Sequence, residues 1–188
     1  DGSTDNTPEI LSHFDDPLIR ILRNETNLGL TRSLNRAVAE SRAPLLARQD
    51  ADDLSEPARL ERQVAEMTPE PDLAVLGTFA QEIDENGEVI HLHDRPVSAA
   101  AVREHAHAGR NPFVHGSVLI RREALHAVDG YDERFRLAQD YDLWLRLLAR
   151  FEGRNLTEPL YRLRRHEHAA GRRAPLAQLA YAELALDA

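Results

Sequence analysis

Hydrophobic and polar residues recur with two different periods along the first half of this chain. Short apolar or β-branched runs have the length and alternation of strands, whereas apolar residues three or four positions apart favour amphipathic helices. This pattern predicts strands at 17–22, 45–49 and 73–77 and helices at 7–14, 29–40 and 55–67. Strands that alternate with helices imply an α/β fold with a mostly parallel sheet, in which ligands bind beyond the carboxyl ends of the strands.

The second half of the chain has a more mixed pattern. It predicts a hairpin turn at 84–87 that leads to Val89 and Ile90, strands at 113–120 and 160–163, and helices at 99–108, 122–128, 140–151 and from 175 onward. The residues expected on shared helix faces are Leu60, Val64 and Met67, and Tyr141, Trp144, Leu145, Leu148 and Phe151. No linker divides the chain, so we expect one domain over 1–168, with 160–163 as an edge strand, and a helical tail over 169–188.

Composition narrows the class of protein. The 188 residues are 42% hydrophobic and 29% charged, which is typical of a soluble globular protein. No apolar run approaches the roughly 20 residues of a membrane-spanning helix. The net charge of −9 argues against sequence-independent binding to nucleic acid, and the lack of cysteine fits a reducing compartment. We therefore expect a cytoplasmic protein, free or peripheral at the inner face of the membrane.

Three carboxylates, Asp50, Asp52 and Asp53, crowd the end of the run at 45–49. Like charges this close repel, so the cluster requires a compensating interaction. A divalent cation is one such interaction, because Mg²⁺ and Mn²⁺ prefer carboxylate oxygens and share them with substrate phosphates. Capping of the following helix is the alternative, although a cap uses only one or two of these groups. The residues alone leave both interpretations open.

Three further segments carry candidate chemistry. Asp140 opens the helix at 140–151, where it can cap the helix or act as a general base. The segment 162–168 is rich in Arg and His, which suit phosphate oxygens and Mn²⁺-like metals, but a solvated basic strand end has the same composition. His115 lies in an apolar run, where an isolated histidine is usually structural.

Five segments, in this order along the chain, resemble motifs of the family 2 glycosyltransferases. The match covers roughly 1–168, and five elements in the same order are far more specific than a lone DxD motif. The segments are Asp1-Gly2-Ser3-Thr4-Asp5; Asn27-Leu28-Gly29-Leu30 with Ser33-Leu34-Asn35; the DxD segment from Asp50 to Gln63; Gly130-Tyr131-Asp132 with Asp140-Tyr141-Asp142-Leu143-Trp144; and Tyr161-Arg162 with His166.

The resemblance implies a Rossmann-like GT-A fold whose DxD carboxylates hold Mn²⁺ or Mg²⁺ against the diphosphate of a nucleotide sugar. Asp52 would be the direct metal ligand, and Asp50 would contact the ribose or the metal's shell. Asp1 would approach the base, and His166 would contact the metal or the diphosphate. The family's first βαβ elements precede Asp1 and are absent from this sequence. We therefore expect an N-terminally truncated fragment with weak or no activity by itself.

The resemblance also implies the reaction. Asp140 would deprotonate an acceptor hydroxyl for in-line attack at the anomeric carbon, with inversion, and His115, Tyr131 and Trp144 would lie on the acceptor side. The expected enzyme transfers a sugar, of the hexosyl type, to a glycan, a lipid-linked acceptor or another hydroxyl in cell-envelope polysaccharide synthesis. The alternative is a catalytically inactive remnant that binds a nucleotide or a glycan.

Overall fold

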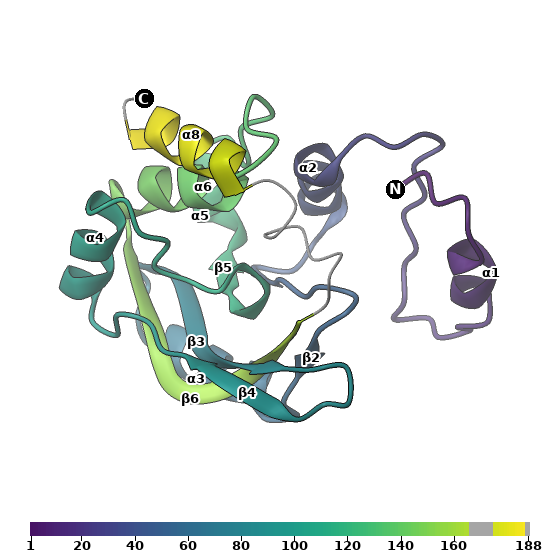
Figure 1. The fold of residues 1–188 in the computed structure, drawn as a ribbon, viewed down its shortest axis with the longest axis horizontal. Coiled ribbons are helices and arrows are strands. Elements are labelled where there is room, and N and C mark those ends of the chain that lie inside the picture. Colours follow the sequence, from purple (N-terminus) through teal and green to yellow (C-terminus); the bar gives the residue numbers. More distant parts are fainter. Residues whose placement is uncertain (166–174, 187–188) are drawn as a thin grey trace.

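The computed structural model describes residues 1–165 and 175–186, which form a curled sheet with helices on both faces (Figure 1). The strands are β1 (Leu45–Ala47), β2 (Leu54–Ser55), β3 (Leu73–Ile83), β4 (Val89–His93), β5 (Leu119–Arg121) and β6 (Glu152–Arg164). The helices are α1 (Thr7–Ser12), α2 (Leu30–Glu40), α3 (Arg59–Met67), α4 (Ala99–His107), α5 (Arg122–Ala127), α6 (Gln139–Leu148) and α8 (Pro175–Leu186), with a 3₁₀ turn η1 (His115–Ser117). This architecture confirms the expected α/β class.

The sheet is centred on the two long strands. Its order is β1-β5-β3-β6-β2, and β4 is a further partner of β3. Among the described strands only β3 and β6 pair in parallel; the other four pairings are antiparallel, so the expectation of a mostly parallel sheet is wrong for this part of the chain. One cause is a tight turn: the Asp84 carboxylate accepts hydrogen bonds from the amides of Asn86 and Glu88, and the chain reverses directly into β4.

The predicted edge strand at 160–163 is the end of the much longer β6. This strand lies between β3 and β2, and the edge prediction is therefore wrong. Pro159 has no amide hydrogen to donate, and it lies opposite Phe79, where the register with β3 shifts. That irregularity explains how a strand that contains proline takes a central place.

The N-terminal arm corrects another prediction. Residues 17–22 alternate like a strand but form none, and Figure 1 shows this arm and α1 extending away from the sheet. The side chains of Leu18, Ile19 and Ile21 are 91%, 46% and 46% exposed. No described strand runs beside the segment, so its backbone has no ladder of hydrogen bonds to join.

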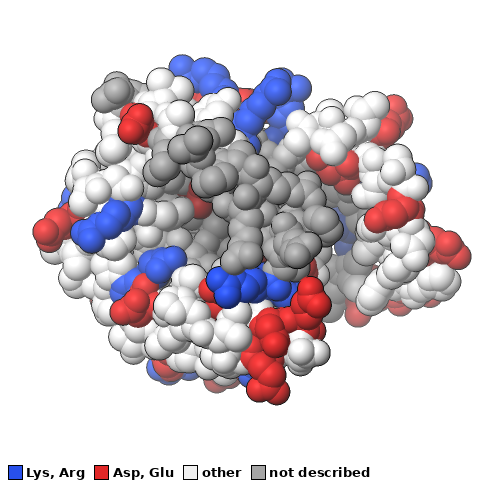
Figure 2. Space-filling view, viewed as in Figure 1, with Lys and Arg blue, Asp and Glu red and all other residues white. Residues whose placement is uncertain are grey.

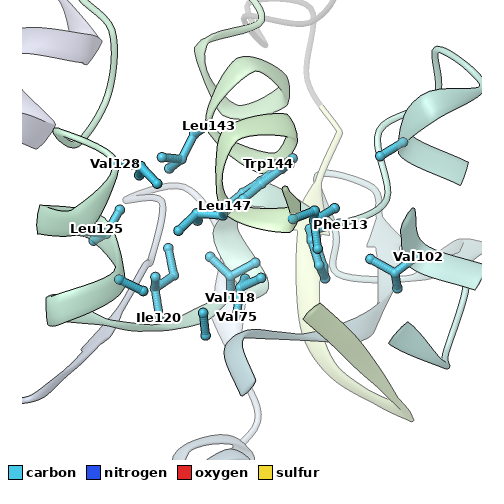
Figure 3. Close-up of a cluster of buried hydrophobic side chains, with 14 of the residues drawn as sticks. Val75, Val102, Phe113, Val118, Ile120, Leu125, Val128, Leu143, Trp144 and Leu147 are labelled. Atoms are coloured by element: carbon cyan, nitrogen blue, oxygen red, sulfur yellow. The ribbon is translucent and has the colours of Figure 1, made fainter. Parts of the chain in front are cut away.

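The main core lies between the sheet and α4, α5 and α6 (Figure 3). Leu143, Trp144 and Leu147 of α6 pack against strand residues such as Val75 and Ile120. Neighbouring residues on β3 and β5 point to the opposite face of the sheet, where Leu76 and Leu119 pack with Met67 of α3. Leu143 and Leu147 of α6 are buried although they lie outside the face predicted to be buried, so the helix is enclosed on more than one side. The core thus fixes the start of α6, which carries Asp140.

The buried face of α3 differs from the prediction. Leu60 and Val64 are 50% and 41% exposed, whereas Arg59, Gln63 and Met67 are buried. Gln63 is satisfied in the interior because its Nε2 donates to the carbonyls of Leu76, at 2.6 Å, and Ser117, at 2.9 Å. Polar side chains with such partners can occupy a core face, which a count of apolar residues does not detect.

The segment 113–120 is only partly a strand. It forms the 3₁₀ turn η1 before β5 begins at Leu119, and within this turn a Cβ on Gly116 would lie 2.1 Å from the Tyr161 hydroxyl, so the position needs glycine. The helices expected at 29–40, 99–108 and 122–128 are confirmed as α2, α4 and α5, and the tail helix as α8. In α8, Ala185 packs with Phe135 and Tyr141. No helix within 1–165 or 175–186 is long and apolar enough to cross a membrane.

Candidate functional site

Asp53 anchors the acidic loop that joins β1 to β2. Its side chain is buried, and its Oδ2 and Oδ1 accept hydrogen bonds of 2.7 Å from the Tyr161 hydroxyl and the Arg164 amide. Burial raises the pKa of this carboxyl group, although both hydrogen bonds act in the opposite direction. Because α3 begins only at Arg59, Asp53 is not its cap, and the capping interpretation is wrong for this residue.

The other two carboxylates of the loop lie nearer the surface. The Asp50 amide donates to the Tyr161 hydroxyl at 3.1 Å, and the Asp50 carboxylate, which is 37% exposed, forms an ion pair with Arg48. Asp52 is exposed, and its carbonyl accepts a hydrogen bond from Nε of Arg164 at 3.1 Å. The loop is therefore held to β6 through its backbone and through Asp53, while Asp50 is partly exposed and Asp52 is exposed.

The buried side chain of Arg59 also holds this loop in place. Arg59 is only 2% exposed, and its Nη1 donates to Gln49 Oε1 at 3.1 Å and to Ser55 Oγ at 2.7 Å. Its Nη2 donates to the Arg48 carbonyl at 2.7 Å. In turn, Gln49 Nε2 donates to the Asp53 carbonyl at 3.1 Å. This network fixes where β1 ends and the acidic loop begins.

The end of β6 also joins the acidic loop to the turn between β3 and β4. Nη1 of Arg164 donates to the carbonyls of Asp84 and Glu85 at 3.2 and 3.3 Å. Figure 2 shows acidic side chains gathered over the region of this turn, beside basic ones. Arg164 thus ties two acidic segments to one strand end.

Asp140 lies in the first turn of α6, across from the acidic loop. Its Oδ2 accepts a hydrogen bond of 2.6 Å from Asn111 Nδ2, and the side chain is partly exposed. The N-cap of α6 is Ala138, in a left-handed conformation with φ 54° and without a side-chain cap, so Asp140 is not the cap. Asp142 is buried and bonds Arg146, at 2.6 Å. Of the two acids, only Asp140 remains available to a ligand.

His115 and Tyr131 form a hydrogen-bonded pair beside Asp140. His115 Nε2 lies 2.8 Å from the Tyr131 hydroxyl. Burial lowers the pKa of His115 to about 4, with Asp140 acting to raise it and Arg48 to lower it further. Burial also raises the pKa of Tyr131, so both side chains are neutral at pH 7. Arg48, Asp140 and this pair therefore lie close enough to interact electrostatically.

The remaining predicted site residues have structural contacts. Trp144 is fully buried in the core, with its ring 5.9 Å from that of His115. The Asp1 carboxylate accepts hydrogen bonds from the amides of Leu28, at 2.8 Å, and Gly29, at 2.9 Å, and in this way it supports the turn before α2. His166 lies outside the described residues.

The donor set fits a divalent cation that shares its ligands with a substrate. Within the described residues, no group of three or more His, Cys, Asp or Glu side chains could hold a metal ion. Asp50 and Asp52 alone offer the one or two carboxylates with which Mg²⁺ is usually bound when phosphates and water complete its shell. The chemistry of these two residues therefore suits Mg²⁺ or Mn²⁺ in a site completed by phosphate.

A groove of about 330 Å³ opens beside this site, between α2 and β1. Its polar lining residues are Ser41, Arg48, Gln49 and Tyr131, and its other lining residues include Leu34, Val38, Leu46, Ile120 and Leu125. Arg48 and Arg59 are not among the site residues predicted from the sequence. The signal for Arg48 was available, because it is the one charged side chain within the run 45–49.

Comparison with known proteins identifies relatives of the whole described region. The model of glycosyl transferase family 2 matches residues 1–129. The chain is 36% identical over 181 residues to EpsE of Bacillus subtilis (strain 168), which is named as a glycosyltransferase. The alignment covers 93% of this chain and 63% of EpsE. It is 32% identical over 179 residues to the O-antigen biosynthesis glycosyltransferase WbnJ of Escherichia coli, covering 93% and 67%.

The fold also matches a solved structure. The crystal structure of S. aureus TarS 1-349 in complex with UDP-GlcNAc superposes with a TM-score of 0.69 at 17% identity, over 89% of this chain and 48% of that one. This likeness confirms the expected GT-A fold. The chain spans about half to two thirds of the length of these relatives.

Proposed function

This chain belongs to glycosyl transferase family 2, and on that premise we propose that it forms the catalytic part of a nucleotide-sugar-dependent glycosyltransferase. The donor is a nucleotide-diphosphate sugar, and the acceptor is a hydroxyl group of a glycan or of a lipid-linked sugar. The name of WbnJ, for O-antigen biosynthesis, supports a role in cell-envelope polysaccharide synthesis. UDP-GlcNAc in the TarS complex makes UDP the first nucleotide to test.

The observation that carries the proposal is that the acidic loop and the first turn of α6 both bring carboxylates near His115. Asp50 and Asp52 lie on a loop held by β6, and Asp140 lies at the start of α6. The charges of Asp50 and Asp140 both act on His115, so both carboxylates lie near that residue. Asp50 and Asp52 would hold Mn²⁺ or Mg²⁺, which supplies Lewis-acid stabilisation of the leaving diphosphate.

Asp140 is the general base of the proposed reaction. Asn111 donates to one of its oxygens and so orients the carboxylate, whose other oxygen can receive the proton of the acceptor hydroxyl. The acceptor oxygen then forms a bond to the anomeric carbon while the bond from that carbon to the diphosphate oxygen breaks. Attack from the face opposite the diphosphate inverts the anomeric configuration. His115 and Tyr131 form the neutral wall on the acceptor side.

Release of nucleoside diphosphate by the complete protein, with a panel of nucleotide sugars and Mn²⁺, tests this proposal. We expect Asp140→Asn to lower kcat by about 10²- to 10⁴-fold with little change in UDP affinity. Asp52→Asn should instead weaken metal-dependent UDP binding. Asp16→Asn is the matched control, because Asp16 is exposed on the N-terminal arm, where its carboxylate accepts a hydrogen bond from the Leu18 amide that an asparagine oxygen can also accept.

Three outcomes would count against parts of the proposal. Full turnover by Asp140→Asn would exclude Asp140 as the base. Equal UDP affinity with and without Mn²⁺ would exclude the metal site. Binding of a nucleotide without turnover of any sugar in the panel would favour the alternative of a non-catalytic nucleotide- or glycan-binding protein.

A further inference from the structure

Arg48 is a buried cation, and two of its three guanidinium nitrogens have no hydrogen-bond partner among the described residues. Its side chain is only 9% exposed, and its Nε and Nη1 are buried with no hydrogen-bond acceptor among the described residues. Nη1 lies beside the Asp50 carboxylate as an ion pair, but without the geometry of a hydrogen bond. Burial of unsatisfied guanidinium donors costs free energy, so the position calls for an explanation.

Arg59 provides the contrast within the same network. It is buried as deeply, yet its Nε, Nη1 and Nη2 all donate hydrogen bonds, to Gln63, to Gln49 and to the Arg48 carbonyl. Arg59 therefore has the contacts of a structural residue. Arg48 differs from it in having two donor atoms without a hydrogen-bond partner, in lining the groove beside α2, and in pairing with Asp50 near His115.

We propose that Arg48 binds a phosphate oxygen of the donor's diphosphate, and that its ion pair with Asp50 is the resting arrangement that ligand binding replaces. This inference rests on the proposed function and assigns a further donor-binding residue to it. A guanidinium donates charge-assisted hydrogen bonds to phosphate oxygens, and Nε and Nη1 of Arg48, which point to different sides of the group, each have a donor for one such bond. Of the described arginines near the acidic loop, Arg59 and Arg164 are already engaged by protein acceptors.

The exchange keeps the buried charges balanced. Without ligand, Arg48 and Asp50 neutralise each other in a partly buried site. When a cation binds Asp50 and a phosphate binds Arg48, each charge keeps a partner of opposite sign, and neither is left alone in a region of low dielectric. Without a metal, water solvates the Asp50 carboxylate, which is 37% exposed, when Arg48 turns to a phosphate, so Arg48 should contribute to nucleotide affinity in that case too. A residue that served only as the counter-ion of Asp50 would contribute nothing there.

Calorimetric titration of the complete protein with UDP, in the presence of EDTA, measures this contribution. We expect Arg48→Gln to weaken UDP binding by about 10- to 100-fold, the range of a charge-assisted hydrogen bond, and Arg48→Lys to weaken it less. Affinity for uridine, which has no phosphate, should not change. Arg62→Gln is the control, because Arg62 pairs with Glu158 on the surface. Circular dichroism establishes that each variant is folded.

Asp50→Asn separates the two possible roles of Arg48. If Arg48 contacts phosphate, Arg48→Gln weakens UDP binding in the Asp50→Asn protein as well. If Arg48 only neutralises Asp50, its substitution has no effect in that background, and the inference is wrong. Equal UDP affinity of Arg48→Gln and the wild type would overturn it too, and leave the proposed function intact. Failure of the wild type to bind UDP, GDP or TDP with Mn²⁺ would instead refute the proposed function.

Discussion

Replacement of Tyr161 by phenylalanine tests whether β6 holds the acidic loop in place. The ring of Tyr161 is fully buried, so the substitution removes the hydroxyl and leaves the packing unchanged. That hydroxyl donates to Asp53 Oδ2 at 2.7 Å and accepts from the Asp50 amide at 3.1 Å. Its loss leaves a buried carboxylate with one donor fewer and an amide without its acceptor.

The expected cost follows from these two contacts. A hydrogen bond to a charged group contributes about 1.5–3 kcal/mol and a neutral one about 1 kcal/mol, so unfolding should become easier by roughly 2–4 kcal/mol. For a chain of this size that corresponds to a fall in Tm of about 5–15 °C. Thermal and urea unfolding, followed by circular dichroism at pH 7, measure both quantities. Tyr181→Phe is the control, because the Tyr181 ring stacks on Phe135 and its hydroxyl has no hydrogen bond in the described part of the chain.

The pH dependence identifies Asp53 as the source of the effect. Burial raises the pKa of Asp53 above its unfolded value, so the stability that its protonation contributes is present at low pH and is lost as the pH rises through the folded pKa. The Tyr161 hydroxyl favours the ionised form, and its removal raises that pKa further. The destabilisation by Tyr161→Phe should therefore be smaller at pH 4 than at pH 7. A change in Tm below about 1 °C, or the same loss at both pH values, would refute the contact.

Three further substitutions test other parts of the structure. Gly116→Ala should destabilise the fold and weaken metal-dependent UDP binding, because its Cβ would lie 2.1 Å from the Tyr161 hydroxyl; calorimetry would show no change if the two do not touch. His115→Gln should reduce the loss of stability that the wild type shows as the pH falls from 6.5 to about 4, because neutral His115 stabilises the fold above that range. Parallel curves of unfolding free energy against pH for variant and wild type would contradict this. Leu18→Gln should change the unfolding free energy by less than about 0.5 kcal/mol in urea titrations, because Leu18 is 91% exposed, and a larger loss would mean that the arm is packed.

Local periodicity predicted the helices well because a helix satisfies most of its hydrogen bonds within itself. The helices α2 and α6 lie close to where apolar spacing placed them, and they need no distant partner to define their bounds. A strand needs a neighbouring strand to complete its backbone hydrogen bonds. The sequence pattern therefore predicted one strand that does not form and underestimated the length of another. Residues 17–22 have a strand's alternation but no partner, whereas β6 contains proline and several charges and still pairs with β3 along its length. Which strands meet is a property of the whole fold.

The pattern of hydrophobic and polar positions could not predict the buried polar residues either. Arg59 and Gln63 occupy the inner face of α3 because the carbonyls of Arg48 and Ser117 accept their hydrogen bonds. Such partners come from elements on either side of the helix in sequence, so no window of residues around α3 contains both. Apolar spacing alone selected Leu60 and Val64 for that face, and both are exposed.

The acidic loop shows which properties of the three carboxylates the sequence could predict and which required the structure. Composition could say that three neighbouring carboxylates require compensation, but it could not say which carboxylate receives which partner. In the structure Asp53 is compensated by Tyr161 and Arg164, which follow it by 108 and 111 residues, and Asp50 by Arg48, which precedes it by two. The distant partners give Asp53 a structural role and keep the loop in one shape. Among the described residues the Asp50 carboxylate pairs only with nearby Arg48, and in the exchange proposed above it changes partners when a ligand binds, while Asp53 holds the loop.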